Sequence, residues 1–266
     1  MISLSPKLSV TIITFNEEKN IERCLESVKW ADEIVVVDSY STDLTVEICR
    51  RFTDRIYLHK FEGHIEQKNI SLSCAAGEWI LAVDADEIIS DSLRAEIKKV
   101  LSSPDSFDGY NINRENYYLG KRIMHSGWSP DYKIRLFRKD KGIWSGVNPH
   151  DSIMLKGKSG RLESPILHYS YPDLSRHFAT IDFFTSITAR EYFKSGRRCL
   201  LSDLLLRPKL AFLKKYFLKC GFLDGIRGIM IAVTTFFYVF LKYAKLWELG
   251  IAKNTPHKRG DGTSRR

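Results

Sequence analysis

The chain has 266 residues and a net charge of +9. Its length allows one large domain, or one domain with an appendage. Its contents of 44% hydrophobic and 27% charged residues are ordinary for a globular protein. Its five cysteines have neither CxxC nor zinc spacing, which excludes a disulfide-rich or zinc-binding class and favours buried thiols in a reducing compartment. Residues 1–7 contain no apolar stretch, so no signal peptide is expected.

Strands and helices are predicted to alternate over the first third of the chain. Apolar runs rich in β-branched residues predict strands, and apolar residues at helical spacing predict helices with one buried face. The strands are predicted over residues 8–15, 33–37, 55–58 and 79–83, and the helices over 21–28, 46–52 and 65–76. Gly77 is expected to end the third helix. Short connections then predict an α/β fold, with a mostly parallel, Rossmann-like sheet flanked by helices.

Polar side chains follow three of these strands, and ligands of open α/β sheets bind at the carboxyl ends of strands. These side chains are Thr14, Asn16, Glu17, Asp38, Asp84 and Asp86. Their carboxylates can accept hydrogen bonds from ribose hydroxyls or from a uracil N–H, although an Asx turn explains Asp38 equally well. Neither GxGxxG nor a Walker A loop is present, which weakens a dinucleotide or ATP interpretation.

Three carboxylates crowd the end of the 79–83 strand, at Asp84, Asp86 and Glu87. They repel one another unless a cation lies between them, and Mg²⁺ or Mn²⁺ with substrate phosphates suits such oxygen ligands. A metal and diphosphate site is therefore predicted at Asp84 and Asp86. The alternative is a solvated acidic turn, with Asp91 capping the helix that follows.

The combination of these segments resembles glycosyltransferase family 2, inverting enzymes with the GT-A fold. The matching stretches lie within residues 8–138 and read SVTIITFNEEKNIERCLESV, EIVVVDSYSTDLTVEI, QKNISLSCAAGEWILAVDADE and GWSPDYKIRLFRK. The chain is also similar to lipopolysaccharide core glucosyltransferases that extend the inner-core heptose. The resemblance implies that Asp38 contacts the nucleobase or ribose of the donor and that Lys68 lies nearby. It also implies that Asp84 and Asp86 form a DXD pair, with Asp86 as the metal ligand.

Inverting transfer needs a base for the acceptor hydroxyl, and two later aspartates are candidates. Asp151, in the loop after His150, is favoured over Asp131, which precedes an alternating strand over residues 132–137; a capping role is the alternative for both. His150 is a candidate metal ligand or donor to phosphate. Arg135 or Arg138, on that strand, is a candidate fork donor to the diphosphate, and a solvated strand face explains them almost as well.

Aromatic residues follow the predicted metal site, at Tyr117, Tyr118, Trp128 and Trp144. Aromatic rings beside polar groups suit stacking on a sugar, and core packing is the alternative. His168 lies among apolar residues and is interpreted as structural. Asp173 is expected to cap a helix that ends at Gly196.

The whole charge excess lies in the last quarter, where residues 200–266 hold 13 Lys and Arg against four Asp and Glu. Basic residues alternate there with leucines, and Gly221 and Gly225 interrupt the pattern. Residues 229–241 form an apolar run of 13, shorter than the roughly 20 that a spanning helix needs. A helical hairpin lying in the interface of an anionic membrane is therefore predicted, and packing on the catalytic domain or a second subunit is the alternative. No nucleic-acid partner is expected, because the basic residues do not form a separate solvated patch.

These features predict a catalytic domain over residues 1–199, a membrane-associating segment over 200–250 and a disordered basic tail over 251–266. The predicted enzyme is cytoplasmic, peripheral to a bacterial inner membrane, and moves a sugar, in the first place glucose from UDP-glucose, to a lipid-linked acceptor of the lipopolysaccharide core. One alternative is transfer to a polyprenyl phosphate, an anion that needs no base. Another is a non-catalytic protein that binds sugar nucleotides.

Overall fold

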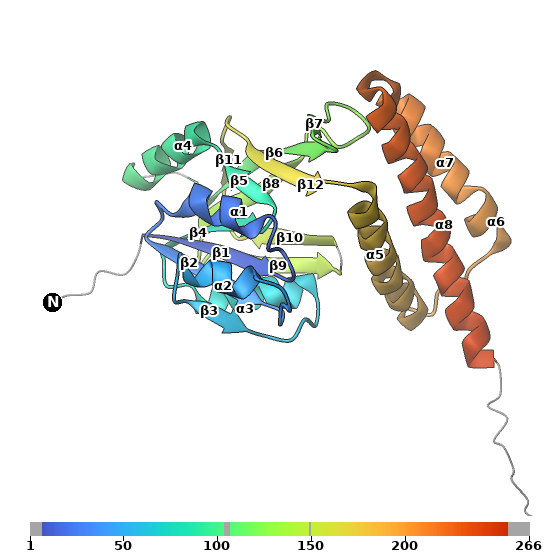
Figure 1. The fold of residues 1–266 in the computed structure, drawn as a ribbon, viewed down its shortest axis with the longest axis horizontal. Coiled ribbons are helices and arrows are strands. Elements are labelled where there is room, and N and C mark those ends of the chain that lie inside the picture. Colours follow the sequence, from blue (N-terminus) through green and yellow to red (C-terminus); the bar gives the residue numbers. More distant parts are fainter. Residues whose placement is uncertain (1–6, 104–106, 149, 255–266) are drawn as a thin grey trace, which may run out of the picture.

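A computed structural model describes residues 7–103, 107–148 and 150–254, without the side chains of His150 and residues 252–254. Its amino-terminal half contains the expected parallel sheet (Figure 1). The parallel strands are β1 (Leu8–Thr14), β2 (Glu33–Asp38), β3 (Ile56–Leu58) and β4 (Trp79–Asp84), in the order β3-β2-β1-β4. Because β1 lies between β2 and β4, the polar residues after these three strands meet at one edge of the sheet.

Beyond β4 the sheet is mixed, which the sequence pattern did not predict. The strands continue as β8 (Tyr132–Arg138), β6 (Gly109–Tyr118), β12 (Ile166–Tyr171) and β5 (Glu87–Ile89), with β7 (Lys121–Arg122) and β11 (Ser159–Arg161) also paired to β6. β8 is antiparallel to both β4 and β6. β5 pairs with β12, and this register places His168 opposite Glu87.

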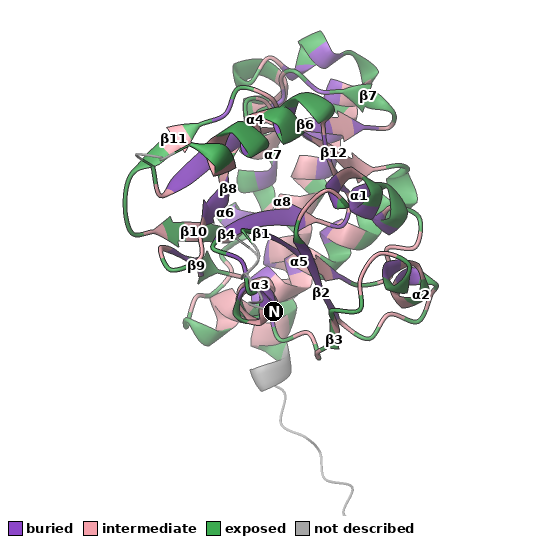
Figure 2. Cartoon of the chain, turned by 90° about the vertical axis from the view of Figure 1, so that its left-hand side faces the viewer, coloured by how far each residue is buried: buried purple, intermediate pink, exposed green. Residues whose placement is uncertain are grey.

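Helices cover both faces of the sheet. On one face lie α1 (Ile21–Val28), α2 (Thr45–Arg50) and α4 (Asp91–Ser102), and on the other α3 (His64–Cys74) with the hairpin of β9 (Gly142–Val147) and β10 (His150–Leu155). Figure 2 shows buried strands between helices whose outer faces are exposed. The cap of α4 is Ser90, whose Oγ accepts from the Leu93 N–H at 3.2 Å, and not Asp91, which was the cap in the alternative of a solvated acidic turn.

Gly77 does not end the third helix, as was predicted, but allows two strands to pack closely. α3 ends at Cys74, and the next residue, Ala75, is already extended. A Cβ on Gly77 would lie 2.6 Å from both the backbone nitrogen and Oγ of Ser9. Glycine is therefore needed here so that the start of β4 can approach β1.

The last third of the chain forms a helical bundle beside the sheet (Figure 1). Its elements are α5 (Leu174–Lys194), α6 (Leu201–Leu205), α7 (Arg207–Leu213), the π-helical turn η1 (Lys214–Leu218), the 3₁₀ turn η2 (Gly221–Asp224) and α8 (Ile226–Asn254). Asp173 caps α5 by accepting from the Arg176 N–H at 2.7 Å, and Gly196 follows its end with a φ of +79°, both as predicted. The chain reverses between α7 and α8 at Gly221 and Gly225, the two predicted interruptions.

α8 is longer than the apolar run of residues 229–241 suggested. Its residues Ile226–Ile251 are long and apolar enough to cross a membrane, and no other helix in the described ranges meets this test of length and composition. A helix packed within a soluble protein can meet the same test. On one side α8 is held by α5, where Lys245 Nζ donates to Asp182 Oδ1 and Ser186 Oγ, each at 2.7 Å. α5 thus belongs to the helical bundle, although it precedes the domain boundary predicted at residue 200.

The bundle joins the sheet through an aromatic cluster. His177 of α5 stacks on Tyr171, with ring centroids 4.1 Å apart, and its Nδ1 lies 3.0 Å from the hydroxyl of Tyr118. Burial lowers the pKa of His177 to about 4, so the ring is neutral and accepts a hydrogen bond from the Tyr118 hydroxyl.

A second contact holds the loop over residues 119–128 against η2 and α8. The Asp224 carboxylate accepts from the Met124 N–H at 3.1 Å, the His125 N–H at 3.2 Å and the Ser126 hydroxyl at 2.8 Å. Arg227 donates to the Leu119 carbonyl at 2.8 Å. The turn between α7 and α8 is therefore bonded to a loop of the α/β body.

Stability is expected to fall in acid because of His177. Its pKa is depressed from 6.5 to about 4 on folding, so between these values the unfolded chain binds more protons. The free energy of unfolding should decrease as pH falls through 6.5 and level off below about 4, a loss of about 3 kcal/mol. Urea unfolding of wild type and His177→Gln at pH 7 and pH 4.5 tests this, because the variant lacks this part of the loss. An equal loss in both proteins would contradict the assignment.

Candidate active site

The centre of the predicted site is a buried ion network at the carboxyl end of β4. Arg135 of β8, which is 4% exposed, donates from Nη2 to Asp84 Oδ2 at 2.7 Å and to Glu87 Oε1 at 2.8 Å. Glu87 Oε2 accepts from the Asp84 N–H at 2.8 Å. Burial opposes ionisation of Asp84, but the charges of Arg135 and Lys68 outweigh it and hold the pKa of Asp84 well below its usual value.

Lys68 connects this network to Asp151. Its Nζ lies 3.1 Å from Asp84 Oδ1 and 2.8 Å from Asp151 Oδ2, and 4.3 Å from the centroid of the Trp144 ring. Each oxygen of Asp84 thus faces a cation. This geometry does not support Asp84 as a metal ligand, because a second cation would have to displace Lys68 or Arg135.

Arg114 of β6 connects the network to Asp131. Its Nε and Nη2 lie 2.9 Å and 2.8 Å from Asp131 Oδ2, and its Nη1 lies 3.5 Å from Glu87 Oε1. Burial alone would raise the pKa of Asp131, but the Arg114 guanidinium outweighs burial and lowers it. Since Arg114 Nη1 also lies 3.8 Å from Asp84 Oδ2, both candidate bases lie one cation away from Asp84.

Asp86 faces away from this network and toward His168 of β12. The Nε2 atom of His168 lies 3.2 Å from Asp86 Oδ2, and its Nδ1 atom lies 2.6 Å from Asn116 Oδ1. Asn116 is oriented by its own Nδ2, which donates to the Trp128 carbonyl at 2.8 Å and the Arg114 carbonyl at 3.2 Å. Asn116 Oδ1 therefore accepts from Nδ1–H, which also lies 3.0 Å from Ser170 Oγ, and Nε2 is the ring nitrogen that faces Asp86.

This arrangement fits a divalent cation bound by two protein side chains. A histidine that binds a metal through one nitrogen usually donates from the other to a carbonyl or carboxylate oxygen, as His168 does to Asn116. In the described parts of the chain no three or more His, Cys, Asp or Glu side chains converge into a metal site. Diphosphate and water oxygens would have to complete the coordination, as is usual for Mg²⁺ and Mn²⁺.

The residues predicted to bind the donor line the edge beside Asp86. Thr14 is buried, and its Oγ1 has no partner among the described residues. Asn16 Oδ1 accepts from the Thr42 N–H at 2.8 Å. Glu17 pairs with Arg176 of α5, and burial together with the charge of Asp86 raises the pKa of Glu17.

Asp38 bonds the turn that follows β2, as in the alternative interpretation, although it reaches the third residue on and not the second as in an Asx turn. It is fully buried, and it accepts from the Ser41 N–H at 2.8 Å and the Ser41 hydroxyl at 2.5 Å. Its carboxylate shapes the turn after β2. Contact with a nucleobase or ribose stays a prediction.

The structure corrects the predictions for two aromatic residues and for Arg138, and it does not describe the side chain of His150. Tyr118 and Trp144 are 0% and 6% exposed, so these rings belong to the core and do not offer a face to a sugar. Arg138 pairs with Glu78 at the opposite end of β4, which leaves Arg135 as the arginine near the site. The side chain of His150 is outside the described part of the structure.

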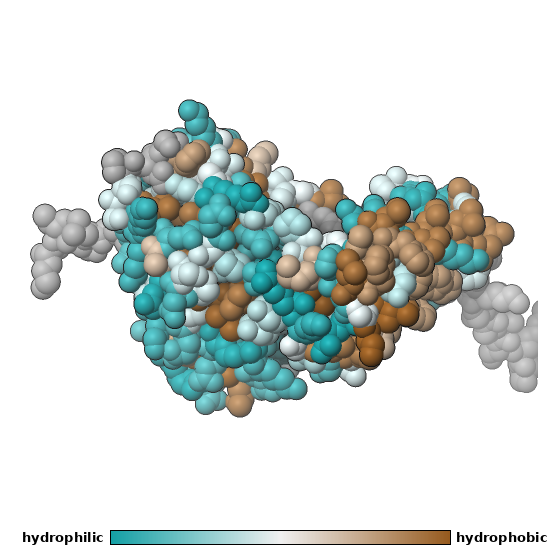
Figure 3. All heavy atoms as spheres, turned by 90° about the horizontal axis from the view of Figure 1, so that it is seen from above, coloured by the Kyte–Doolittle hydropathy of each residue, from teal (hydrophilic) through white to brown (hydrophobic). Residues whose placement is uncertain are grey.

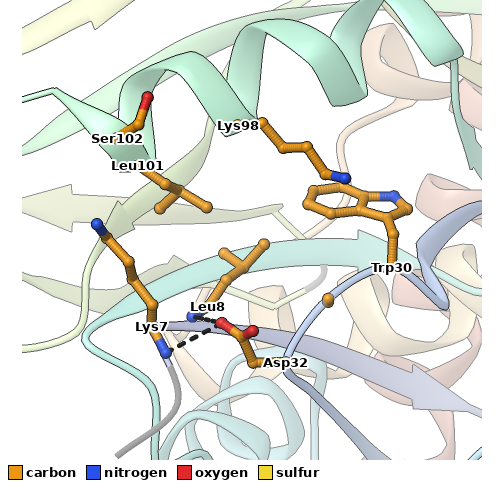
Figure 4. Close-up of a pocket in the computed structure, with 8 residues that line it drawn as sticks. Lys7, Leu8, Trp30, Asp32, Lys98, Leu101 and Ser102 are labelled. Carbon is orange, nitrogen blue, oxygen red and sulfur yellow. Dashed lines mark hydrogen bonds between the residues drawn. The ribbon is translucent and has the colours of Figure 1, made fainter.

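A cavity of about 270 Å³ lies at the opposite edge of the sheet (Figure 4). Lys7, Trp30, Asp32 and Lys98 line it, and Asp32 accepts from the Lys7 and Leu8 N–H groups at 3.0 Å and 2.9 Å. Leu8 begins β1, so this cavity is at the amino ends of the strands, where α/β proteins do not usually place their ligands.

Sequence reasoning missed Arg114, Asn116 and His168. All three lie on β6 and β12, whose pairing with each other and with β5 the sequence pattern did not reveal. His168 is 82 residues from Asp86 in the chain. The one available signal was a histidine in an apolar strand, which by itself is more typical of a structural residue.

A family model described as glycosyl transferase family 2 matches residues 9–161. The lipopolysaccharide core biosynthesis glycosyltransferase LpsC of Rhizobium meliloti is 28% identical, covering 94% of this chain and 95% of LpsC. An uncharacterized glycosyltransferase of Rickettsia typhi is 30% identical, in an alignment that covers 92% of this chain and 88% of the Rickettsia protein. Among solved structures, the mannosyltransferase PcManGT of Pyrobaculum calidifontis, in complex with GDP-Man and Mn²⁺, aligns with a TM-score of 0.53 and 17% identity. That alignment covers 92% of this chain and 88% of PcManGT, and it shows a shared fold.

Proposed function

The chain belongs to glycosyltransferase family 2, and from this premise we propose that it is a metal-dependent, inverting enzyme of lipopolysaccharide core synthesis. The proposed reaction moves glucose from UDP-glucose to a lipid-linked acceptor. The observation that carries the proposal is the pairing of Asp86 with a histidine whose tautomer Asn116 fixes, beside the donor edge of the sheet. The likeness to LpsC over nearly the whole chain supports the choice of pathway.

Asp86 and His168 would hold Mg²⁺ or Mn²⁺. A divalent ion there would offset the negative charge that builds on the departing diphosphate. The relative PcManGT has Mn²⁺ in its complex, which supports the type of ion. Thr14, Asn16 and Glu17 would contact the donor. Arg135 and Lys68 would keep Asp84 ionised and fixed in position next to the metal ligands.

Asp151 is proposed as the base. The acceptor hydroxyl oxygen attacks the anomeric carbon, its proton passes to the Asp151 carboxylate, and the bond from that carbon to the diphosphate oxygen breaks. Asp131 is the alternative base, but its two bonds to Arg114 and its lowered pKa make it the weaker proton acceptor. Asp151 shares its cation, Lys68, with Asp84. Asp151 is therefore less strongly paired with a cation than Asp131 is.

The helical bundle is proposed to bind the surface of an anionic membrane from the cytoplasmic side. Figure 3 shows apolar side chains gathered on that end of the molecule, whereas the α/β body is mainly hydrophilic. Exposed apolar residues there include Leu201, Leu206, Leu210, Phe217, Leu218, Leu223, Ile226 and Trp247. Lys and Arg side chains lie among them, at Arg207, Lys209, Lys214, Lys215 and Lys219. This composition suits an element that lies in the interface. Because α5 belongs to the bundle and α8 runs to Asn254, the catalytic domain is proposed to end before Leu174 and not at residue 199, and the basic tail to begin after Asn254 and not at residue 251.

Transfer assays with the full chain test this proposal. UDP-[¹⁴C]glucose is incubated with the enzyme, Mn²⁺ and envelope lipids from bacteria that lack the gene. We expect label in the lipopolysaccharide fraction and none when EDTA is present. Label in the polyprenyl-phosphate fraction would instead support the alternative acceptor. Donor binding without transfer to any envelope fraction would support the non-catalytic alternative.

A further inference from the structure

Three lysines cluster on and beside the π-helical turn η1 without an acidic partner. Lys214, Lys215 and Lys219 form no ion pair with any carboxylate in the described ranges. Lys215 is half-buried, and burial together with the charges of Lys214 and Lys219 lowers its pKa. An unpaired, partly desolvated cation beside two others is unfavourable, and an anion bound between them would relieve the repulsion.

Two of these lysines lie against a glycine of the loop over residues 119–128. A Cβ on Gly127 would lie 3.2 Å from Lys215 Nζ and 3.3 Å from Lys219 Cγ, and Gly127 has a φ of +67°. The loop is fixed there, because the Ser126 N–H donates to the Lys219 carbonyl at 2.8 Å. The amine of Lys215 therefore lies beside a backbone segment that is bonded to the turn, where a side chain at position 127 would crowd it.

Exposed apolar side chains surround the same turn. Leu213 and Phe217 lie on either side of Lys215 in sequence, and Leu218 is 78% exposed. Phe222 and Leu223 of η2 are also exposed. A soluble anion would match the amines but not this apolar surface, and an apolar protein partner would leave the amines unpaired. A molecule with an anionic head and acyl chains matches both.

We propose that Lys215 and Lys219, at Gly127, form a subsite for the phosphate of an anionic membrane lipid, whose acyl chains contact the apolar residues of η1 and η2. The subsite rests on the proposed membrane association and gives it a defined location. It places the loop over residues 119–128 at the bilayer surface. The same loop carries the Trp128 carbonyl that orients Asn116, and through Asn116 the ring of His168.

The test measures binding of the full-length protein to sedimented vesicles at physiological ionic strength. The vesicles are phosphatidylcholine alone, or phosphatidylcholine with phosphatidylglycerol. The site variant is Lys215→Gln/Lys219→Gln, and the matched control is Lys194→Gln/Lys209→Gln, which removes two exposed charges from the helical bundle outside the three-lysine cluster. We expect the site variant to lose at least tenfold more affinity for phosphatidylglycerol vesicles than the control. Both should bind phosphatidylcholine vesicles as the wild type does, and their unfolding midpoints should match.

Equal losses in the two variants would overturn the subsite, because a diffuse positive field would then explain the binding. Membrane association would survive that result. Wild-type protein that binds neither vesicle would overturn both. Inorganic phosphate at millimolar concentration should compete only weakly, since it lacks acyl chains; full competition would show a site for free phosphate and would contradict the lipid assignment.

Discussion

Replacing Asp86 by Asn is expected to lower kcat/KM for sugar transfer by about 10²–10³-fold. The amide keeps the shape of the side chain but removes the charge that, with His168, would hold the divalent ion at the diphosphate. Initial rates with UDP-glucose and saturating Mn²⁺ measure the effect. The unfolding midpoint should change little, because Asp86 lies outside the buried network of Asp84, Glu87 and Arg135.

Two further variants sharpen this result. Asn116→Leu removes the closer of the two partners of His168 Nδ1–H and leaves Ser170 Oγ at 3.0 Å, so the apparent affinity for Mn²⁺ should fall by about 10–100-fold, with the rate partly restored at high Mn²⁺. The matched control is Asp91→Asn, which replaces an exposed carboxylate at the start of α4. This variant should behave as wild type. If Asp86→Asn retained wild-type rates, the metal assignment would have to be abandoned.

The second large effect is expected for Asp151→Asn, which should lower kcat by about 10²–10⁴-fold while leaving the affinity for UDP-glucose nearly unchanged. Asn cannot take the proton of the acceptor hydroxyl. Lys68 keeps its partner Asp84, so the donor edge should remain intact. Single-turnover rates with purified lipid acceptor, together with donor binding by calorimetry, separate the loss of proton transfer from a loss of binding.

Asp131→Asn is the comparison that decides between the two aspartates. Because Arg114 lowers the pKa of Asp131, we expect a smaller loss of kcat there, caused by altered positioning of Arg114. A larger loss in Asp131→Asn than in Asp151→Asn would exchange their roles. Full activity in both variants would indicate an acceptor that is already an anion, such as a polyprenyl phosphate.

The parallel half of the sheet could be predicted because its information is local. Strands β1 to β4 are apolar runs bounded by polar turns, and their order follows from short connections through helices. The crowded carboxylates of the DADE segment, which begins at the end of β4, are local in the same way, and the metal site predicted from them stays a prediction. The same local reasoning correctly identified the Asp173 cap and the Gly196 helix end.

The partners of those residues could not be predicted, because they depend on pairing between distant strands. Arg135 reaches Asp84 only because β8 runs antiparallel to β4, and His168 reaches Asp86 only because β12 pairs with β5. Neither register leaves a periodic trace in one sequence. For the same reason Trp144 and Tyr118 resembled sugar-binding rings, since core and surface aromatics have the same composition before packing is known.

The metal and diphosphate site is tested by calorimetric titration of the full chain with UDP-glucose, in Mn²⁺ and in EDTA, for wild type and Asp86→Asn. We expect wild type to bind UDP-glucose only when the metal is present, and Asp86→Asn not to bind it. Equal binding of UDP-glucose in all four titrations would contradict a metal and diphosphate site at Asp86 and His168.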